Sequence, residues 1–417
     1  MYRNIVRLLF PSVFAFALLL SGGAIAAQEE FPQPVHAVVA IEGEAFISRF
    51  VPPDGYAAET LLTVGAFVSS NDLIEAGPGD RVVIVCADQT VDEISNELRA
   101  PNCAPLTGQG VFVWNNVEVY GSVRAAEVVY AVSPRHSTIF DAMPDFELSS
   151  PPPSGSTYTI ELWNMNEQRV IWEGTGITSE VIPYPLDEPL RATDPATGRP
   201  IRYQLVVTTM RDDNAIRNRD PMRPLGFCII DPRDRPVVDQ LQARIDQLEL
   251  PTGVGPEVRS FNLGALYYGQ GLFVDARHAL EALLTVPLDE PFPTEAISAN
   301  SIAGSPSYYI LLGSVYYAMR LSNEMELAYR RAEDLATTID DAASLAIVNE
   351  QLADIRRGRL QQVRPNGNAR DQEIYERYQA AIDFYTEIGD TVSVDRVLSK
   401  LENGLQVSDD ANHCTYD

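Results

Sequence analysis

The residues best suited to chemistry are four cysteines, Cys86, Cys103, Cys228 and Cys414. None of them forms a Cys-x-x-Cys pair, so the sequence contains neither a zinc-knuckle motif nor a thioredoxin-type redox motif. Cys86 and Cys103 stand close together in one β-rich segment, which favours a disulfide between them in an oxidising compartment. Cys228 and Cys414 either form a second disulfide or remain as buried free thiols.

The sequence shows no pattern typical of a catalytic centre. The four histidines, His36, His136, His278 and His413, lie in separate segments and form no HxH, HxxxH or HExxH pair. There is no GxSxG nucleophile elbow, no P-loop and no GxGxxG after a strand. The single lysine, Lys400, lies in a polar helical stretch that does not suit Schiff-base chemistry. We therefore expect a protein that is not an enzyme and needs no cofactor.

One acidic loop is the best metal candidate. Its oxygen ligands are Asp212, Asp213, Asn214, Asn218 and Asp220, a set that suits extracellular Ca²⁺. However, the loop lacks the glycine and the terminal glutamate of an EF-hand. We interpret it as the tip of an acidic hairpin and predict no metal site.

Residues 1–26 have the pattern of a secretory signal peptide. A basic start, a short apolar run and a small-x-small cleavage site follow one another: Arg3 and Arg7, Leu8–Leu20, and Ala24-Ile25-Ala26. The alternative is a permanent anchor, but the run is short and is followed by Glu29-Glu30 instead of a basic stop. We expect cleavage near Ala27 and an exported protein, periplasmic or extracellular, with no stable membrane span.

The length and charge of the chain narrow the class of partner. The 417 residues are enough for two or three domains, and the formal net charge is -27. Such a surface repels phosphate backbones and anionic lipid headgroups, so nucleic-acid binding is not expected.

Two successive β domains are expected before a helical one, which gives a multidomain fold, β then α. In residues 37–125, short apolar runs rich in β-branched side chains alternate with turns. Ile41-Glu42-Gly43-Glu44-Ala45, then Leu62-Thr63-Val64-Gly65-Ala66, then Asn71-Asp72-Leu73-Ile74-Glu75 precede the strand at Val82. This order resembles the FecR-type β domain.

Residues 130–230 have the rhythm of an immunoglobulin- or fibronectin-like β-sandwich. Tyr158, Ile160 and Leu162 alternate with polar residues, and prolines lie between the strands. Trp163 and Trp172 are either sugar-stacking residues or aromatics that pack the strands.

Residues 237–407 are expected to be helical, with 408–417 as a tail. Leu263-Gly264-Ala265-Leu266-Tyr267-Tyr268 and Leu312-Gly313-Ser314-Val315-Tyr316-Tyr317 share one spelling, and a second helical run follows each. This resembles the tetratricopeptide repeat. The two copies stand 49 residues apart, against about 34 in the family, and Arg320 replaces the first copy's Gly271. Ala380-Ala381-Ile382 with Tyr385 suggest a third, degenerate unit.

The resemblance implies which residues form the core and which form a concave binding face. The implied core residues are Leu263, Gly264, Tyr267, Leu312, Gly313 and Tyr316. The implied partner-binding residues are Phe261, Ala265, Tyr268, Ile310, Ser314 and Tyr317. An equally good alternative is that helices from Ala342 onward cover this face and make all six residues ordinary core.

The leading hypothesis is an exported, non-enzymatic binding or scaffold protein that holds a protein or peptide partner in the helical domain. One alternative is a FecR-type envelope signalling protein, which the absence of a cytoplasmic regulatory segment disfavours. Another is a secreted hydrolase acting on glycans, with Trp163 and Trp172 as stacking platforms.

Overall fold

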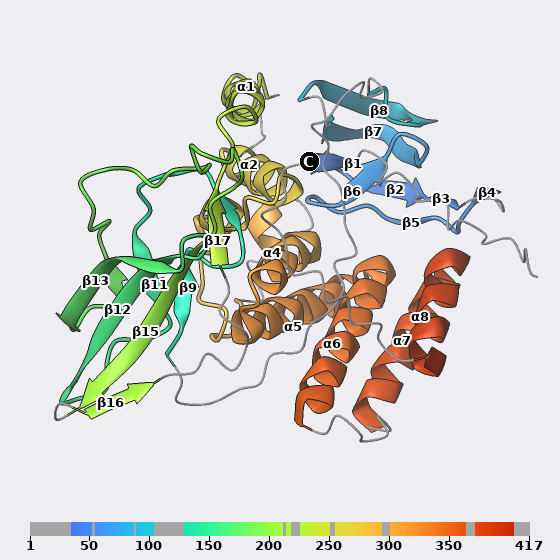
Figure 1. The fold of residues 1–417 in the computed structure, drawn as a ribbon. Coiled ribbons are helices and arrows are strands. Elements are labelled where there is room, and N and C mark those ends of the chain that lie inside the picture. The colour runs from blue at the N-terminus through green and yellow to red at the C-terminus, as the bar shows by residue number, and fades with distance from the viewer. Residues whose placement is uncertain are drawn as a thin grey trace, which may run out of the picture. The chain divides into compact units, whose positions relative to one another are not determined.

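The computed structural model describes residues 35–51, 55–86, 89–103, 129–211, 214–217, 226–250, 255–293, 301–363 and 372–403. In these residues a β-rich part precedes a helical part, as the sequence predicts (Figure 1). The predicted signal peptide and tail lie outside the described residues. None of the helices described here is long and apolar enough to cross a bilayer.

The first sheet is built around one long strand, β7. Its strands are β1 (Val35–Glu42), β2 (Ala45–Ser48), β5 (Thr60–Leu61), β6 (Phe67–Ser69), β7 (Leu73–Val85) and β8 (Val91–Arg99), and β3 (Phe50–Val51) pairs separately with β4 (Gly55–Tyr56). The order is β5-β2-β7-β1-β6, and β8 also pairs with β7. The first part of β7 pairs with β2 and the last part with β1, on either side of Gly77-Pro78-Gly79-Asp80. The register shifts at that segment, where Gly79 takes a φ of 94°.

The second β region contains a larger and a smaller sheet. The larger has the order β10-β17-β15-β12-β13, with β16 on β15, and the smaller has the order β14-β11-β9. The bounds are β9 (Ala131–Ser133), β10 (Thr138–Ile139), β11 (Phe146–Leu148), β12 (Ser156–Asn164), β13 (Arg169–Ile177), β14 (Val181–Ile182), β15 (Tyr203–Arg211), β16 (Asn214–Arg217) and β17 (Gly226–Ile229). On β12 the apolar residues Tyr158, Ile160 and Leu162 are buried, so the alternation in the sequence does mark the core face.

The helical part contains α1 (Arg235–Asp246), α2 (Glu257–Gly269), α3 (Phe273–Glu281), η2 (Ile302–Gly304), α4 (Pro306–Ala318), α5 (Ser322–Ile339), α6 (Ala342–Val363), α7 (Gln372–Glu387) and α8 (Thr391–Asn403). From α2 to α8, each described α-helix packs against the next one along the chain. Helices α6, α7 and α8 lie side by side (Figure 1).

Capping residues explain where several of these helices begin. The Ser305 hydroxyl accepts the backbone N–H of Ser307 at 3.2 Å, with Pro306 at the first helical position of α4. At α8, the Asp390 carboxylate accepts the N–H of Ser393 at 3.0 Å. Asp390 therefore caps the start of α8.

Candidate functional site

The residues that the repeat resemblance places on a binding face are buried. Phe261, Ala265, Tyr268, Ile310, Ser314 and Tyr317 are each at most 9% exposed. The Phe261 ring stacks on Phe67 of the first sheet with the ring centroids 5.8 Å apart. The Ser314 hydroxyl lies 3.1 Å from the Tyr329 hydroxyl and donates to the Ile310 carbonyl.

Helix α6 contributes to the same apolar core as these six residues. Its Val348, Leu352 and Ile355 belong to that core, and α6 also packs on α4. Helix α6, and at Phe261 the first sheet as well, therefore contribute to the packing around these residues. The six residues are buried and make packing contacts in this structure. Their binding of a partner stays a prediction.

The two spellings in the sequence do correspond to two equivalent hairpins, α2–α3 and α4–α5. A Cβ atom added at Gly264 would lie 2.5 Å from Cγ of Leu280, and one at Gly313 would lie 2.9 Å from Cε1 of Tyr329. Leu280 and Tyr329 each stand 16 residues after their glycine. Both glycines therefore let the second helix of a hairpin approach the first at the same register.

The turns inside these hairpins also match. The N–H of Leu272 donates to the Tyr267 carbonyl at 2.8 Å, and the N–H of Leu321 donates to the Tyr316 carbonyl at 2.8 Å. The residue before each donor is left-handed, with a φ of 71° at Gly271 and 58° at Arg320. Arg320 thus takes the conformation of the glycine that it replaces, and the substitution does not change the turn.

A third turn of the same kind joins α7 to α8. The N–H of Asp390 donates to the Tyr385 carbonyl at 2.8 Å, and Gly389 between them has a φ of 75°. Counting back from this turn puts Ile382 where the first two hairpins have glycine. The degenerate unit that the sequence suggests around Ala381-Ile382 therefore has the shared turn without the shared glycine.

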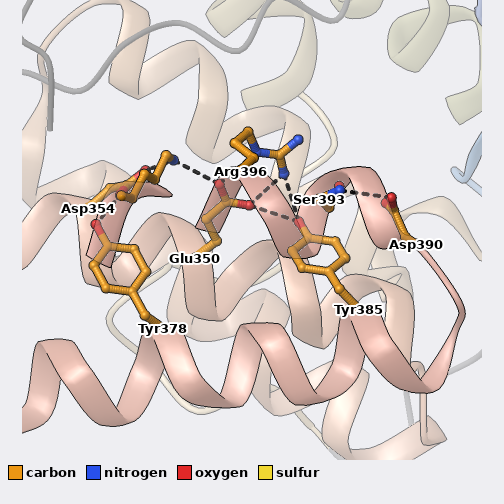
Figure 2. Close-up of polar contacts among 8 residues, drawn as sticks. Glu350, Asp354, Tyr378, Tyr385, Asp390, Ser393 and Arg396 are labelled. Carbon is orange, nitrogen blue, oxygen red and sulfur yellow. Dashed lines mark hydrogen bonds and ion pairs between the residues drawn. The ribbon is translucent and has the colours of Figure 1, made fainter. Parts of the chain in front are cut away.

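A buried cluster of charges takes the place of close glycine packing in this last hairpin. Helix α6 contributes Glu350 and Asp354, whose side chains are 3% and 1% exposed. Helix α8 contributes Arg396 and Lys400, and α7 contributes two tyrosines, Tyr378 and Tyr385 (Figure 2).

Glu350 is the centre of this cluster. Its Oε1 accepts Arg396 Nε at 3.0 Å and Lys400 Nζ at 2.7 Å. Its Oε2 accepts Arg396 Nη2 at 2.7 Å and the Tyr385 hydroxyl at 2.9 Å. Asp354 accepts Lys400 Nζ at 2.6 Å and also the Tyr378 hydroxyl. Figure 2 shows these side chains converging from the three helices.

The protonation states follow from burial and from this pairing. Burial raises the pKa of Glu350, but the hydrogen bonds and charges of Arg396 and Lys400 outweigh it and lower the pKa to about 2. Burial, and after it the charge of Glu350, raise the pKa of Asp354 overall, although Lys400 and the Tyr378 hydroxyl lower it. Burial lowers the pKa of Lys400, but the two carboxylates raise it overall, so the ammonium group stays protonated.

The cluster is suited to holding helices together. It pairs two acids with two bases, and each of its six side chains makes a hydrogen bond within the group. A protonated lysine between two carboxylates is not a nucleophile, and a carboxylate with a pKa of about 2 is a weak base. We therefore interpret the cluster as the attachment of α8 to α6 and α7.

The sequence does contain a signal for this cluster that motif searches miss. Glu350 and Asp354 are four residues apart, as are Arg396 and Lys400, so each pair lies on one helix face. Acidic and basic pairs with equal spacing on two helices of one domain predict facing partners. Lys400 is therefore an ion-paired residue of the cluster, although the polar helix around it suggests a solvent-exposed lysine.

The disulfide predicted between Cys86 and Cys103 is present, with the Cα atoms 5.6 Å apart. It joins the end of β7 to the segment after β8. Cys228 is also disulfide-bonded, and Cys414, its predicted partner, lies outside the described residues.

The remaining candidate residues are the two tryptophans and the acidic loop. The Trp163 indole N–H donates to Glu161 at 2.9 Å, and the Trp172 ring lies 6.0 Å from the Phe146 ring. Both tryptophans are half-buried, as expected of aromatics that pack strands. Of the proposed calcium loop, Asp212, Asp213, Asn218, Asp220 and the side chain of Asn214 lie outside the described residues.

Comparison with known proteins adds no family assignment, because no family model matches the chain and no curated protein is significantly similar to it.

Proposed function

We propose that the protein is an exported, non-catalytic binding protein whose tetratricopeptide-repeat-like helical domain holds a protein or peptide partner. The FecR-like and sandwich-like β domains of this proposal serve as its supporting modules. The observation that carries it is the repeated hairpin turn at Tyr267–Gly271, Tyr316–Arg320 and Tyr385–Gly389. Stacked helical hairpins present extended surfaces to partners, and their chemistry is that of binding.

The last hairpin is the part of the helical domain best placed for contact. Exposed large apolar side chains of the described helices are Val237 on α1, Tyr375 on α7, and Val392 and Leu398 on α8. Three of these four belong to the hairpin that ends the described helices. Exposed apolar and aromatic residues are the usual anchors of protein interfaces, so we place the partner there.

The test is capture of a partner from envelope extract by the full chain. Because the chain has one lysine and it is ion-paired, cross-links should be formed with a carboxylate-reactive reagent. We expect cross-links to α7 and α8, and at least tenfold weaker capture by the variant Tyr375→Ser with Leu398→Asp.

Val237→Asp provides the matched control, since Val237 is 42% exposed and Leu398 is 40% exposed. It should leave capture unchanged. Equal loss in both variants, or cross-links confined to residues 35–217, would remove the helical hairpin from the interface. Hydrolysis of glycan or peptidoglycan by the purified chain would instead support the enzyme alternative.

A further inference from the structure

One histidine and the Cys86–Cys103 disulfide form a compact group in the first β domain. Strands β1 and β7 are antiparallel, and their last pair is Ala37 with Val85, so His36 and Cys86 each follow one residue beyond it. Cys103 reaches the same place from the segment after β8. One ring nitrogen of His36 and the two sulfur atoms all lie within 4.8 Å of one another.

Contacts other than the disulfide hold His36, Cys86 and the residue before Cys103. His36 Nε2 lies 2.8 Å from the Ser70 hydroxyl. The N–H of Cys86 donates to the Thr90 carbonyl at 2.8 Å. Next to Cys103, the N–H of Asn102 donates to the Asp92 carboxylate at 2.8 Å, which restrains the backbone before Cys103.

Asp92 is itself held firmly, because the Arg99 guanidinium donates to both of its oxygens at 2.8 and 2.9 Å. The approach to Cys103 is therefore ordered by a charged pair that does not depend on the oxidation state of the sulfurs. His36 and Cys86 are buried, whereas Cys103 is half-buried and gives a route from solvent.

We infer that reduction of the Cys86–Cys103 disulfide converts this group into a binding site for Zn²⁺ or a similar thiophilic divalent cation. Two thiolates and one imidazole form the Cys₂His ligand set that zinc takes when its fourth position is left to solvent. The Ser70 hydroxyl at Nε2 orients the ring of the ligand histidine.

The chemistry balances in two steps. A thiol or phosphine reductant supplies two electrons and is oxidised, and the S–S bond is replaced by two protonated thiols. The cation then displaces the two thiol protons and binds both sulfurs, which leaves a site of zero net charge. The sulfurs must move apart by about 2 Å to reach bonds of about 2.3 Å each, a change that side-chain rotation supplies. The oxidised protein has no thiolate to offer and does not bind the cation.

The test uses the full chain and Co²⁺ as a spectroscopic probe. After reduction with a phosphine, we expect one equivalent of Co²⁺ to produce thiolate-to-cobalt absorption, and an excess of Zn²⁺ to abolish it. The oxidised protein should show no such absorption. Cys86→Ser should remove the signal, whereas Cys228→Ser should keep it, which separates this pair from the other cysteines.

Two further variants distinguish a built site from loose thiols. His36→Ala should weaken Co²⁺ binding by at least tenfold, and Ser70→Ala by about tenfold to a hundredfold because it orients the histidine. Circular dichroism of the reduced chain checks that the fold is retained. The inference is overturned by absent thiolate absorption, by binding that His36→Ala leaves unchanged, or by cation binding that requires an unfolded chain.

Discussion

The first two helical hairpins and the last one share a turn but differ in how their helices are held together. In α2–α3 and α4–α5, Gly264 and Gly313 let an apolar or aromatic side chain lie directly on the first helix. In α7–α8, Ile382 stands at that position, and α6 joins both helices through buried carboxylates. The local turn therefore does not determine the packing of a hairpin.

This difference has an energetic consequence. Burial of apolar surface does not depend on protonation, whereas a buried ion-pair cluster does. Removing one partner of such a cluster leaves a buried charge uncompensated and is costly. The last hairpin should therefore respond to pH and to single charge substitutions within this cluster.

The largest expected effect concerns two tyrosines that the repeat resemblance places on the concave binding face. Tyr268 and Tyr317 are 9% and 7% exposed, so replacing both by Ala should lower the free energy of unfolding by more than about 4 kcal/mol. Denaturant unfolding measures the loss. Tyr375→Ala, at a side chain 53% exposed, is the control and should cost less than about 0.5 kcal/mol. A double variant that keeps its stability but no longer captures a partner would instead support partner binding by the six residues.

Loss of the single lysine should come next. Lys400→Met removes the cation shared by Glu350 and Asp354 and should lower the free energy of unfolding by about 3 kcal/mol. Arg330→Met on α5 breaks an ion pair with Glu326 in which the arginine is 55% exposed, and should cost about 0.5 kcal/mol or less. Equal effects of the two substitutions would mean that burial of the cluster contributes nothing special.

Acid should weaken the last hairpin through Glu350. Its pKa is about 2 when folded and 4.5 when unfolded, so its stabilisation is complete above pH 4.5 and is lost as the pH falls toward 2. The raised pKa of Asp354 has the opposite sign and offsets part of this loss. Glu350→Gln should be less stable than wild type at pH 7, with the gap closing between pH 4.5 and 2. Urea unfolding measures the two free energies of unfolding. A difference between variant and wild type that stays constant over this pH range would contradict the low pKa of Glu350.

The smallest effects should come from the turns and should have opposite signs. Arg320→Gly relieves a left-handed arginine and should raise the free energy of unfolding by about 0.5 kcal/mol. Gly271→Ala puts a side chain into the same conformation and should lower it by about 1 kcal/mol. Thermal unfolding of both variants checks the shared geometry, and equal signs would mean that the two turns are not equivalent.

The sequence predicts local features well because the signals for them are local. The helices expected in the C-terminal part are present among its described residues, from α1 to α8. The Cys86–Cys103 bond is also confirmed. Each depends on spacing or on a residue type within a short segment.

The features that the sequence does not reveal depend on which elements meet in space. Nothing in the sequence of α2 or α4 shows that α6 joins their core. The burial of Tyr268 and Tyr317 therefore cannot be predicted from those two segments alone. In the sequence, Lys400 looks like a solvent-exposed charge, because its two acidic partners are 46 and 50 residues away along the chain. Only the matched four-residue spacing of the two charge pairs hints at the contact.

The central claim is that equivalent hairpins are stacked in the helical domain and that one buried charge cluster attaches the last hairpin to α6. Native-state hydrogen exchange of wild type and Lys400→Met, resolved by segment, tests it most directly. We predict faster exchange in α7 and α8 of the variant, and unchanged exchange in α2, α3, α4 and α5. Uniformly faster exchange across all these helices, or no change in α8, would contradict it.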